Sequence, residues 1–139
     1  MSASIYPSDV SRVALLRRYV GERFEIEQGW LSGRCPRSWL TYARPARGAF
    51  AFVLSEWVRM PFREVADHMG IYSVDAWRLA SFAGRTAAHD LAYMENITAV
   101  VRVYLAFELQ RMGVDYPVHG DATRIWYNPD DDGMMNCIT

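Results

Sequence analysis

The chain has 139 residues, a formal net charge of -1, and 51% hydrophobic residues. So much apolar surface excludes a wholly disordered chain, because its burial offsets the entropy cost of ordering. No stretch approaches the ~18–20 apolar residues that cross a bilayer, and no basic segment followed by an apolar one opens the chain, so we expect a cytoplasmic protein.

The first predicted element is a helix over residues 9–28. Ser8 or Asp9 can cap its start, and Gly29 suits its end. Apolar residues recur along it every three or four positions, which is the helical period: Val10, Val13, Leu16, Val20 and Phe24. The other face carries four arginines that we interpret as solvated: Arg12, Arg17, Arg18 and Arg23.

Residues 29–47 are predicted to form a loop or short turns, because glycine and proline interrupt them repeatedly. Basic residues are interleaved with aromatic ones in this segment: Trp30, Arg34, Arg37, Trp39, Tyr42, Arg44 and Arg47. Such interleaving is typical of nucleic-acid binding through charge and stacking. The alternative is an aromatic loop that packs on the core and leaves its arginine tips in solvent.

Several helices are predicted after this loop. Pro45 fits a first helical position, so a helix is expected over about 46–59. A short helix of about two turns should start near Phe62 and end at Gly70, and another should start at Ser73. We expect a further helix over 87–94 and a last one over 96–112. The last helix is apolar almost all round, which indicates a place in the core or in a homo-oligomer interface.

Residues 62–85 contain the most specific pattern in the chain, that of a helix-turn-helix. Ala66 supplies the small residue where two helices cross, and Gly70 stands where the turn needs a left-handed backbone. Ile71 follows as the apolar residue under the turn. Ser73 can cap the second helix, whose inward positions are Ala76 and Leu79. The alternative is an ordinary helical hairpin with a glycine turn.

A helix-turn-helix places its second helix in the major groove of DNA. Arg78 is the best candidate to read a base, because arginine binds guanine O6 and N7 with two hydrogen bonds. Tyr72, Ser73 and Ser81 would accompany it on the outward face. The residues expected to hold phosphates are Arg47, Arg59, Arg63 and Arg85. Trp77 is unusual for a groove, and three positions stay open for it: against DNA, in the core, or against a protein partner.

Residues 46–90 resemble the C-terminal DNA-binding domain of the bacterial replication initiator DnaA and its small relatives that act as regulators in phages and gene transfer agents. The shared outline is the Ala- and aromatic-rich helix 46–56, the short helix ending at Met69-Gly70, and the helix from Ser73. The resemblance implies sequence-specific binding of duplex DNA. The family signature after the glycine reads Asp-His-Ser/Thr-Thr-Val, whereas this chain has residues 71–75, Ile-Tyr-Ser-Val-Asp, of which Ser73 alone matches.

The small net charge conceals a strong asymmetry, and every basic residue is an arginine. Residues 1–63 carry ten arginines and five acidic residues, whereas residues 114–139 carry one arginine and five aspartates. We expect residues 1–113 to form one helical domain and residues 114–139 an irregular acidic extension. Such asymmetry indicates nucleic-acid contact or an interaction tail.

No constellation indicates catalysis, a metal or a cofactor. Cys35 and Cys137 are too few for a disulfide scaffold, and together with the three histidines they lack zinc-ligand spacing. Residues 128–133 partly resemble a calcium loop but have no glutamate at its twelfth position. A phosphate-binding glycine loop is absent from the sequence.

The sequence therefore predicts an all-α protein that binds specific double-stranded DNA as a small bacterial or phage transcriptional regulator. Such a regulator would also contact RNA polymerase if it acts as an activator that binds both promoter DNA and the polymerase. The alternative is a protein-interaction module without DNA specificity, such as a phage-encoded inhibitor or adaptor of host transcription. A third class, a phage packaging or structural component, would form a large stable oligomer.

Overall fold

The computed structural model describes residues 9–113, and within this range all regular structure is helical. The elements in chain order are α2 (Asp9–Phe24), the 3-10 helices η1 (Gln28–Leu31) and η2 (Arg37–Trp39), α3 (Leu40–Glu56), α4 (Phe62–Met69), α5 (Ser73–Ala87) and α6 (Leu91–Arg111). The all-α prediction is confirmed for this part of the chain. The acidic extension predicted over 114–139 lies outside the described residues.

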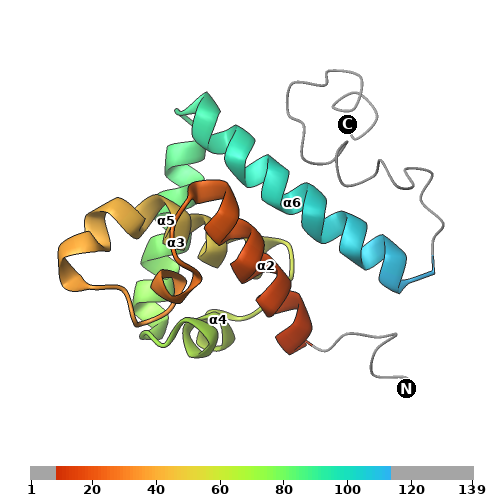
Figure 1. The fold of residues 1–139 in the computed structure, drawn as a ribbon, viewed down its shortest axis with the longest axis horizontal. Helices are drawn as coiled ribbons and strands as arrows, with labels where there is room; N and C mark the ends of the chain where they lie inside the picture. Colours follow the sequence, from red (N-terminus) through yellow and green to blue (C-terminus); the bar gives the residue numbers. More distant parts are fainter. Residues whose placement is uncertain (1–8, 114–139) are drawn as a thin grey trace.

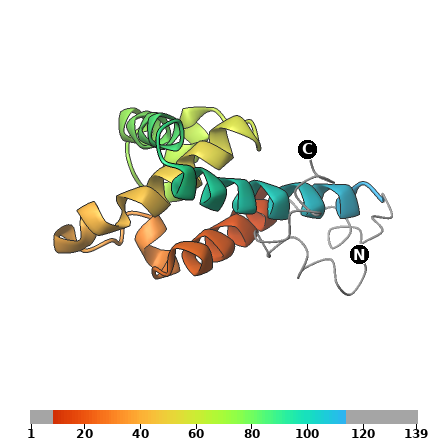
Figure 2. The ribbon, with the colours of Figure 1, turned by 90° about the horizontal axis from the view of Figure 1, so that it is seen from above.

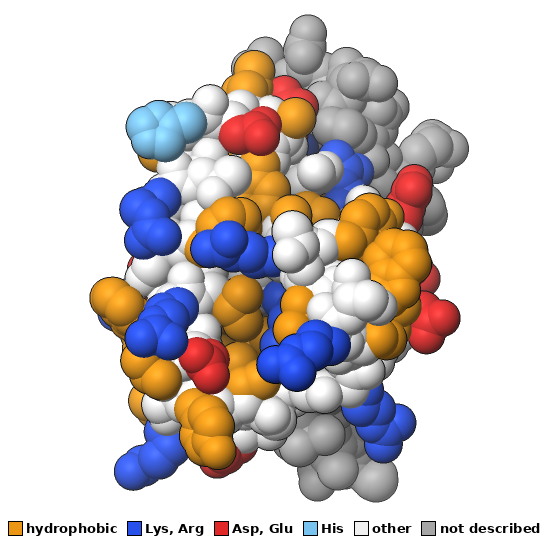
Figure 3. Space-filling view, turned by 90° about the vertical axis from the view of Figure 1, so that its left-hand side faces the viewer, with side chains coloured by type: hydrophobic (Ala, Val, Ile, Leu, Met, Phe, Trp, Pro, Cys, Tyr) orange, Lys and Arg blue, Asp and Glu red, His pale blue; other side chains and the backbone are white. Residues whose placement is uncertain are grey.

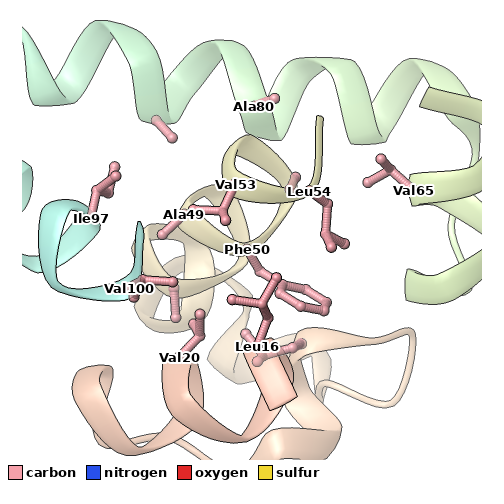
Figure 4. Packing of buried hydrophobic residues seen from close by; sticks show 14 of the residues in the cluster. Leu16, Val20, Ala49, Phe50, Val53, Leu54, Val65, Ala80, Ile97 and Val100 are labelled. Atoms are coloured by element: carbon pink, nitrogen blue, oxygen red, sulfur yellow. The ribbon is translucent and has the colours of Figure 1, made fainter. Parts of the chain in front are cut away.

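Helix α3 lies at the centre of the fold and contacts α2, α4, α5 and α6. Helices α2 and α5 lie on opposite sides of the molecule, as Figure 2 shows, whereas they overlap in the view of Figure 1. Figure 4 shows how one core joins the elements. The buried side chains come from α2 (Leu16, Val20), α3 (Ala49, Phe50, Val53, Leu54), α4 (Val65), α5 (Ala80) and α6 (Ile97, Val100).

The small residues of α3 and α5 allow these two helices to approach closely. A Cβ atom at Gly48 would lie 3.0 Å from the Leu79 carbonyl oxygen and 3.0 Å from the Phe82 ring. The facing positions of α5 are alanines, all buried: Ala76, Ala80 and Ala83. This contact sets how α5 is held against the core.

Helix α2 ends four residues before the predicted position. Glu25 takes a left-handed conformation with φ 58°, and the Ile26 amide donates to the Gly21 carbonyl at 2.9 Å. The prediction placed the end at Gly29, because glycine adopts this conformation most readily. Here a glutamate adopts it instead.

Helix α3 begins at Leu40, so the predicted start near Pro45 is wrong. The short helix η2 leads directly into α3, and Pro45 lies inside the helix. A proline there removes one backbone hydrogen bond, while the residues from Ala43 onward gain burial. The Tyr93 hydroxyl donates to the Pro45 carbonyl at 2.6 Å and joins this part of α3 to α6.

The predicted helices over 87–94 and 96–112 are one helix in the structure. Helix α5 continues to Ala87, and α6 runs unbroken from Leu91 to Arg111. The start signal is Asp90, whose carboxylate accepts from the Tyr93 amide at 3.0 Å. Asn96, the predicted start, accepts instead from Arg23 of α2 at 2.8 Å.

Candidate nucleic-acid interface

The turn between α4 and α5 has the backbone conformation that the sequence predicts. Gly70 ends α4 at φ 67° and ψ 36°, in the left-handed region. The Ile71 amide donates to the Ala66 carbonyl at 3.1 Å, and the Gly70 amide to the Asp67 carbonyl at 3.4 Å. This pair of bonds is the Schellman pattern, which closes a helix end. The turn therefore sets the position of the first residues of α5.

The predicted N-cap at Ser73 is wrong. Ser73 is the first residue of α5, and Tyr72 precedes it in an extended conformation without a side-chain cap bond. The prediction failed because Ser73 belongs to the helix itself, one position later than a cap. An acidic residue in the first turn, Asp75, faces the favourable end of the helix dipole.

The outer face of α5 is exposed over its whole length. Val74, Trp77, Arg78 and Arg85 are exposed there, and Ser81 is half-buried between them. Trp77 is 52% exposed, so it does not belong to the core. The two other positions considered for it, against DNA or against a protein partner, stay open. Tyr72, immediately before the helix, is 79% exposed. This face combines hydrogen-bond donors with apolar side chains.

Three exposed arginines form a row along this face. Arg78 and Arg85 are seven residues apart, which places them two turns apart on the same side of a helix. Arg44 reaches over from α3, and its guanidinium lies 4.3 Å from the centre of the Phe82 ring, between those two positions. Figure 3 shows arginine side chains spread over this side of the molecule, among apolar ones.

Arg44 and Arg78 also line a shallow pocket of about 330 Å³ between α3 and α5. The acidic group in its lining is Asp75, which forms an exposed ion pair with Arg78 at 3.4 Å. Exposed pairs of this kind contribute ~0–1 kcal/mol, so Arg78 can exchange this partner for another acceptor at little cost.

The arginine-rich loop before α3 rests on the same turn. A Cβ atom at Gly33 would lie 2.9 Å from the Gly70 carbonyl oxygen, so the two backbones are in direct contact. This contact places exposed Arg34 beside the turn that precedes α5. Only a glycine at position 33 permits so close an approach.

Arg47 holds this loop from inside and does not fit its predicted role as a phosphate ligand. It is 7% exposed, and its Nη1 donates to the Trp30 and Ser32 carbonyls at 2.8 and 2.6 Å. Burial lowers the pKa of Arg47 from its ordinary value. Arg44 and Arg47 are three residues apart on α3, and both line the pocket against α5. The sequence pattern could not separate them, because they differ only in depth: Arg44 is exposed, whereas Arg47 is buried against the backbone of residues 30 and 32.

Two other predicted phosphate ligands, Arg59 and Arg63, are at the surface near α4. Arg59 lies between α3 and α4, Arg63 lies in the first turn of α4, and both are exposed. Two exposed carboxylates, Glu64 and Asp67, accompany them on α4. The two arginines and the two carboxylates balance each other in charge around α4, whereas the outer face of α5 is basic.

The structure places Arg44 on the candidate surface, and exposed Arg34 follows Gly33, which contacts the turn before α5. Neither arginine was predicted individually as a DNA contact. The sequence pattern that pointed to both was the interleaving of arginine and aromatic residues over 29–47. That pattern did not say which arginine would reach α5, since this depends on how α3, which contains Arg44, packs against α5.

Comparison of the chain with protein-family models, curated protein sequences and solved structures gives no match. Among the described helices, none combines the length and the apolar character needed to cross a membrane.

Proposed function

We propose that this chain binds double-stranded DNA sequence-specifically, with α4 and α5 as a helix-turn-helix, and acts as a small bacterial or phage transcriptional regulator. The observation that carries the proposal is the outer face of α5, where exposed Arg78, Arg44 and Arg85 form a row beside a Schellman turn. The resemblance of residues 46–90 to the DnaA DNA-binding domain supports it independently.

In this proposal α5 enters the major groove with its N-terminal half against base edges. Arg78 binds guanine O6 and N7, and Tyr72 and Ser73 reach the neighbouring bases. Ser81 lies one turn further along the same face. Arg85, Arg44 and Arg34 neutralise phosphates on the two sides of the groove, and Arg59 and Arg63 extend these contacts beyond α4.

The test compares two opposite changes in one ion pair. After selection of a site from random duplex DNA, Arg78→Ala should weaken binding about 5- to 150-fold, equivalent to about 1–3 kcal/mol, and relax preference at one base pair. Asp75→Asn should strengthen binding, because it releases Arg78 and removes a negative charge facing the phosphates.

A matched control is Arg18→Ala, which removes the same charge from an exposed position on α2, on the opposite side of the molecule. Its affinity should stay within twofold of the unchanged protein. If Arg78→Ala binds the selected site as well as Arg18→Ala does, α5 does not read DNA and the proposal fails.

A second candidate, a protein-interaction module, is favoured by the apolar residues on the same face. Tyr72, Val74 and Trp77 are all at least half exposed, and exposed aromatics are typical of protein interfaces. Under this alternative Trp77→Ala abolishes binding to purified bacterial RNA polymerase, while no DNA sequence is enriched from the random pool. Enrichment of a DNA site that depends on Arg78 decides for the first candidate.

A further inference from the structure

A second surface, distinct from the outer face of α5, consists of three aromatic rings beside two carboxylates. The ring centres of Trp30 and Trp39 lie 5.4 Å apart, and those of Trp39 and Tyr42 lie 5.5 Å apart. Together with Glu25, Ile26 and Glu27 these rings line a pocket of about 370 Å³. We call this the aromatic pocket.

The aromatic pocket is preformed by short-range bonds. The Trp30 amide donates to the Glu27 carbonyl at 2.9 Å, and the Trp39 amide donates to the Pro36 carbonyl at 2.9 Å. Buried Arg47 holds the Trp30 carbonyl at 2.8 Å from the other side. A ligand would therefore meet rings that are already ordered, which lowers the entropy cost of binding.

Two of the three rings are exposed, and the third, that of Trp30, is half-buried. Trp39 and Tyr42 are 46% and 56% exposed. Glu25 stands beside them in a left-handed conformation, φ 58°, which costs a non-glycine residue energy. Exposed aromatics and a strained charged residue at one place are features of binding sites rather than of the core.

The charge of the pocket selects its ligand. Glu25 and Glu27 are both exposed, and none of the lining residues is basic. These carboxylates repel phosphates, so the rings do not serve as a platform for nucleic-acid bases. A cation is attracted by the ring faces and by the carboxylates together.

Arginine fits this combination best among biological cations. Its planar guanidinium stacks on an aromatic face and offers paired donors to a carboxylate, whereas an ammonium is a compact, strongly hydrated charge. The same mode already occurs within this fold, where Arg44 lies 4.3 Å from the Phe82 ring centre. The pocket is also too open to enclose most of a free small molecule, as ligand sites generally do.

We propose that the aromatic pocket binds an arginine side chain in a basic segment of a partner protein. The guanidinium stacks on the rings of Trp39 and Tyr42, and Glu25 and Glu27 accept its N–H groups. Leu40, which follows Trp39, lines the other pocket against α5, so the two surfaces adjoin at the start of α3. The partner would thus sit next to bound DNA without sharing its contacts.

The experiment is a titration of the full chain with an acetylated tetra-arginine peptide, followed through the indole N–H signals in proton–nitrogen NMR spectra. The signals of Trp30 and Trp39 should shift, while that of Trp77 on α5 stays in place. A tetra-lysine peptide of equal charge should bind at least threefold more weakly. The Glu27→Gln and Tyr42→Ala variants should each weaken tetra-arginine binding at least fivefold.

The matched control is Glu64→Gln, which removes an exposed carboxylate from α4 and should leave peptide affinity unchanged. Absent shifts of Trp30 and Trp39, equal affinity for both peptides, or equal weakening by Glu64→Gln would each overturn the proposal. Self-association of the chain that Tyr42→Ala abolishes would also overturn it, because the occupant would then be a second copy. None of these outcomes depends on whether α5 binds DNA.

Discussion

At the scale of single residues, arginine has two opposite uses in this protein. Arg17 and Arg47 are turned inward and hold backbone carbonyls, Arg17 that of His68 at 2.7 Å. Arg78 and Arg85 are turned outward on α5. The sequence does not distinguish an inward-facing arginine from an outward-facing one, so the sequence alone predicted Arg47 as a surface cation. Contacts with distant backbone decide between the two uses.

Arg59 has a left-handed backbone, φ 70°, and offers a test that separates strain from DNA contact. Arg59→Gly should raise the free energy of unfolding by about 0.5–1 kcal/mol relative to Arg59→Ala, because glycine carries no Cβ penalty in this region. Both variants should lose the same DNA affinity if the guanidinium contacts phosphate. Urea unfolding and DNA titration measure the two effects, and a less stable glycine variant would contradict the assigned strain.

At the scale of the elements, the local signals near the turn were the most informative. Gly70 and Ile71 make the closing bonds of α4 themselves, so their effect is visible in the sequence. The start of α3 and the continuity of α6 were mispredicted. Pro45 and Asn96 are both ordinary start signals, but in this fold tertiary packing extends the helices past them.

Gly48 tests the close contact of α3 with α5. Gly48→Ala should lower the free energy of unfolding by about 1–3 kcal/mol, because its Cβ would meet the rigid Leu79 carbonyl. Gly84→Ala is the matched control, since its Cβ would meet only the Phe52 ring at 3.6 Å. That variant should gain stability by about 0.5–1 kcal/mol from helix propensity alone. Equal effects in thermal or urea unfolding would show that the contact is not tight.

Tyr93 joins α6 to α3, and it should make the free energy of unfolding depend on pH in the alkaline range. Its ring lies edge-on to Phe24 and Phe82, and burial raises the pKa of Tyr93 well above its ordinary value. From about pH 10 upward an unfolded tyrosine ionises while folded Tyr93 stays protonated, so the free energy of unfolding should fall as pH rises.

Tyr93→Phe should cost about 1 kcal/mol at neutral pH, because the bond to the Pro45 carbonyl is lost. Above pH 10 its stability should fall less steeply than that of the unchanged protein. Some decline remains, since burial also raises the pKa of Tyr104. Urea unfolding at pH 8 and at pH 10.5 measures the difference, and parallel declines would contradict the assignment.

At the scale of the whole molecule, the net charge of -1 is the sum of a basic face and of acidic residues elsewhere in the chain. The outer face of α5 presents Arg44, Arg78 and Arg85, and the aromatic pocket presents Glu25 and Glu27. The two surfaces suit partners of opposite charge. A whole-chain charge therefore does not exclude DNA binding, because the field near each face is set by the groups within about 10 Å.

The five aspartates of residues 114–139 should compete with phosphates for the basic face. Changing Asp130, Asp131 and Asp132 to asparagine should raise DNA affinity at low salt, and removing residues 114–139 should raise it further. The gain should shrink at high salt, where charges are screened. Affinity measured at 50 and 200 mM salt checks this, and an unchanged affinity would assign the tail to another task.

The sequence by itself determined the all-helical class and the turn at Gly70, together with the exposed stretch around Arg78. These features depend on backbone preferences and on a helical period that neighbouring residues express locally. Only the tertiary structure decided which arginines face outward and that Gly33 rests on Gly70. It also brought Glu25 and Tyr42 to one aromatic pocket. The physical reason is that burial and charge are set by residues far apart in the chain, whose approach no local pattern records.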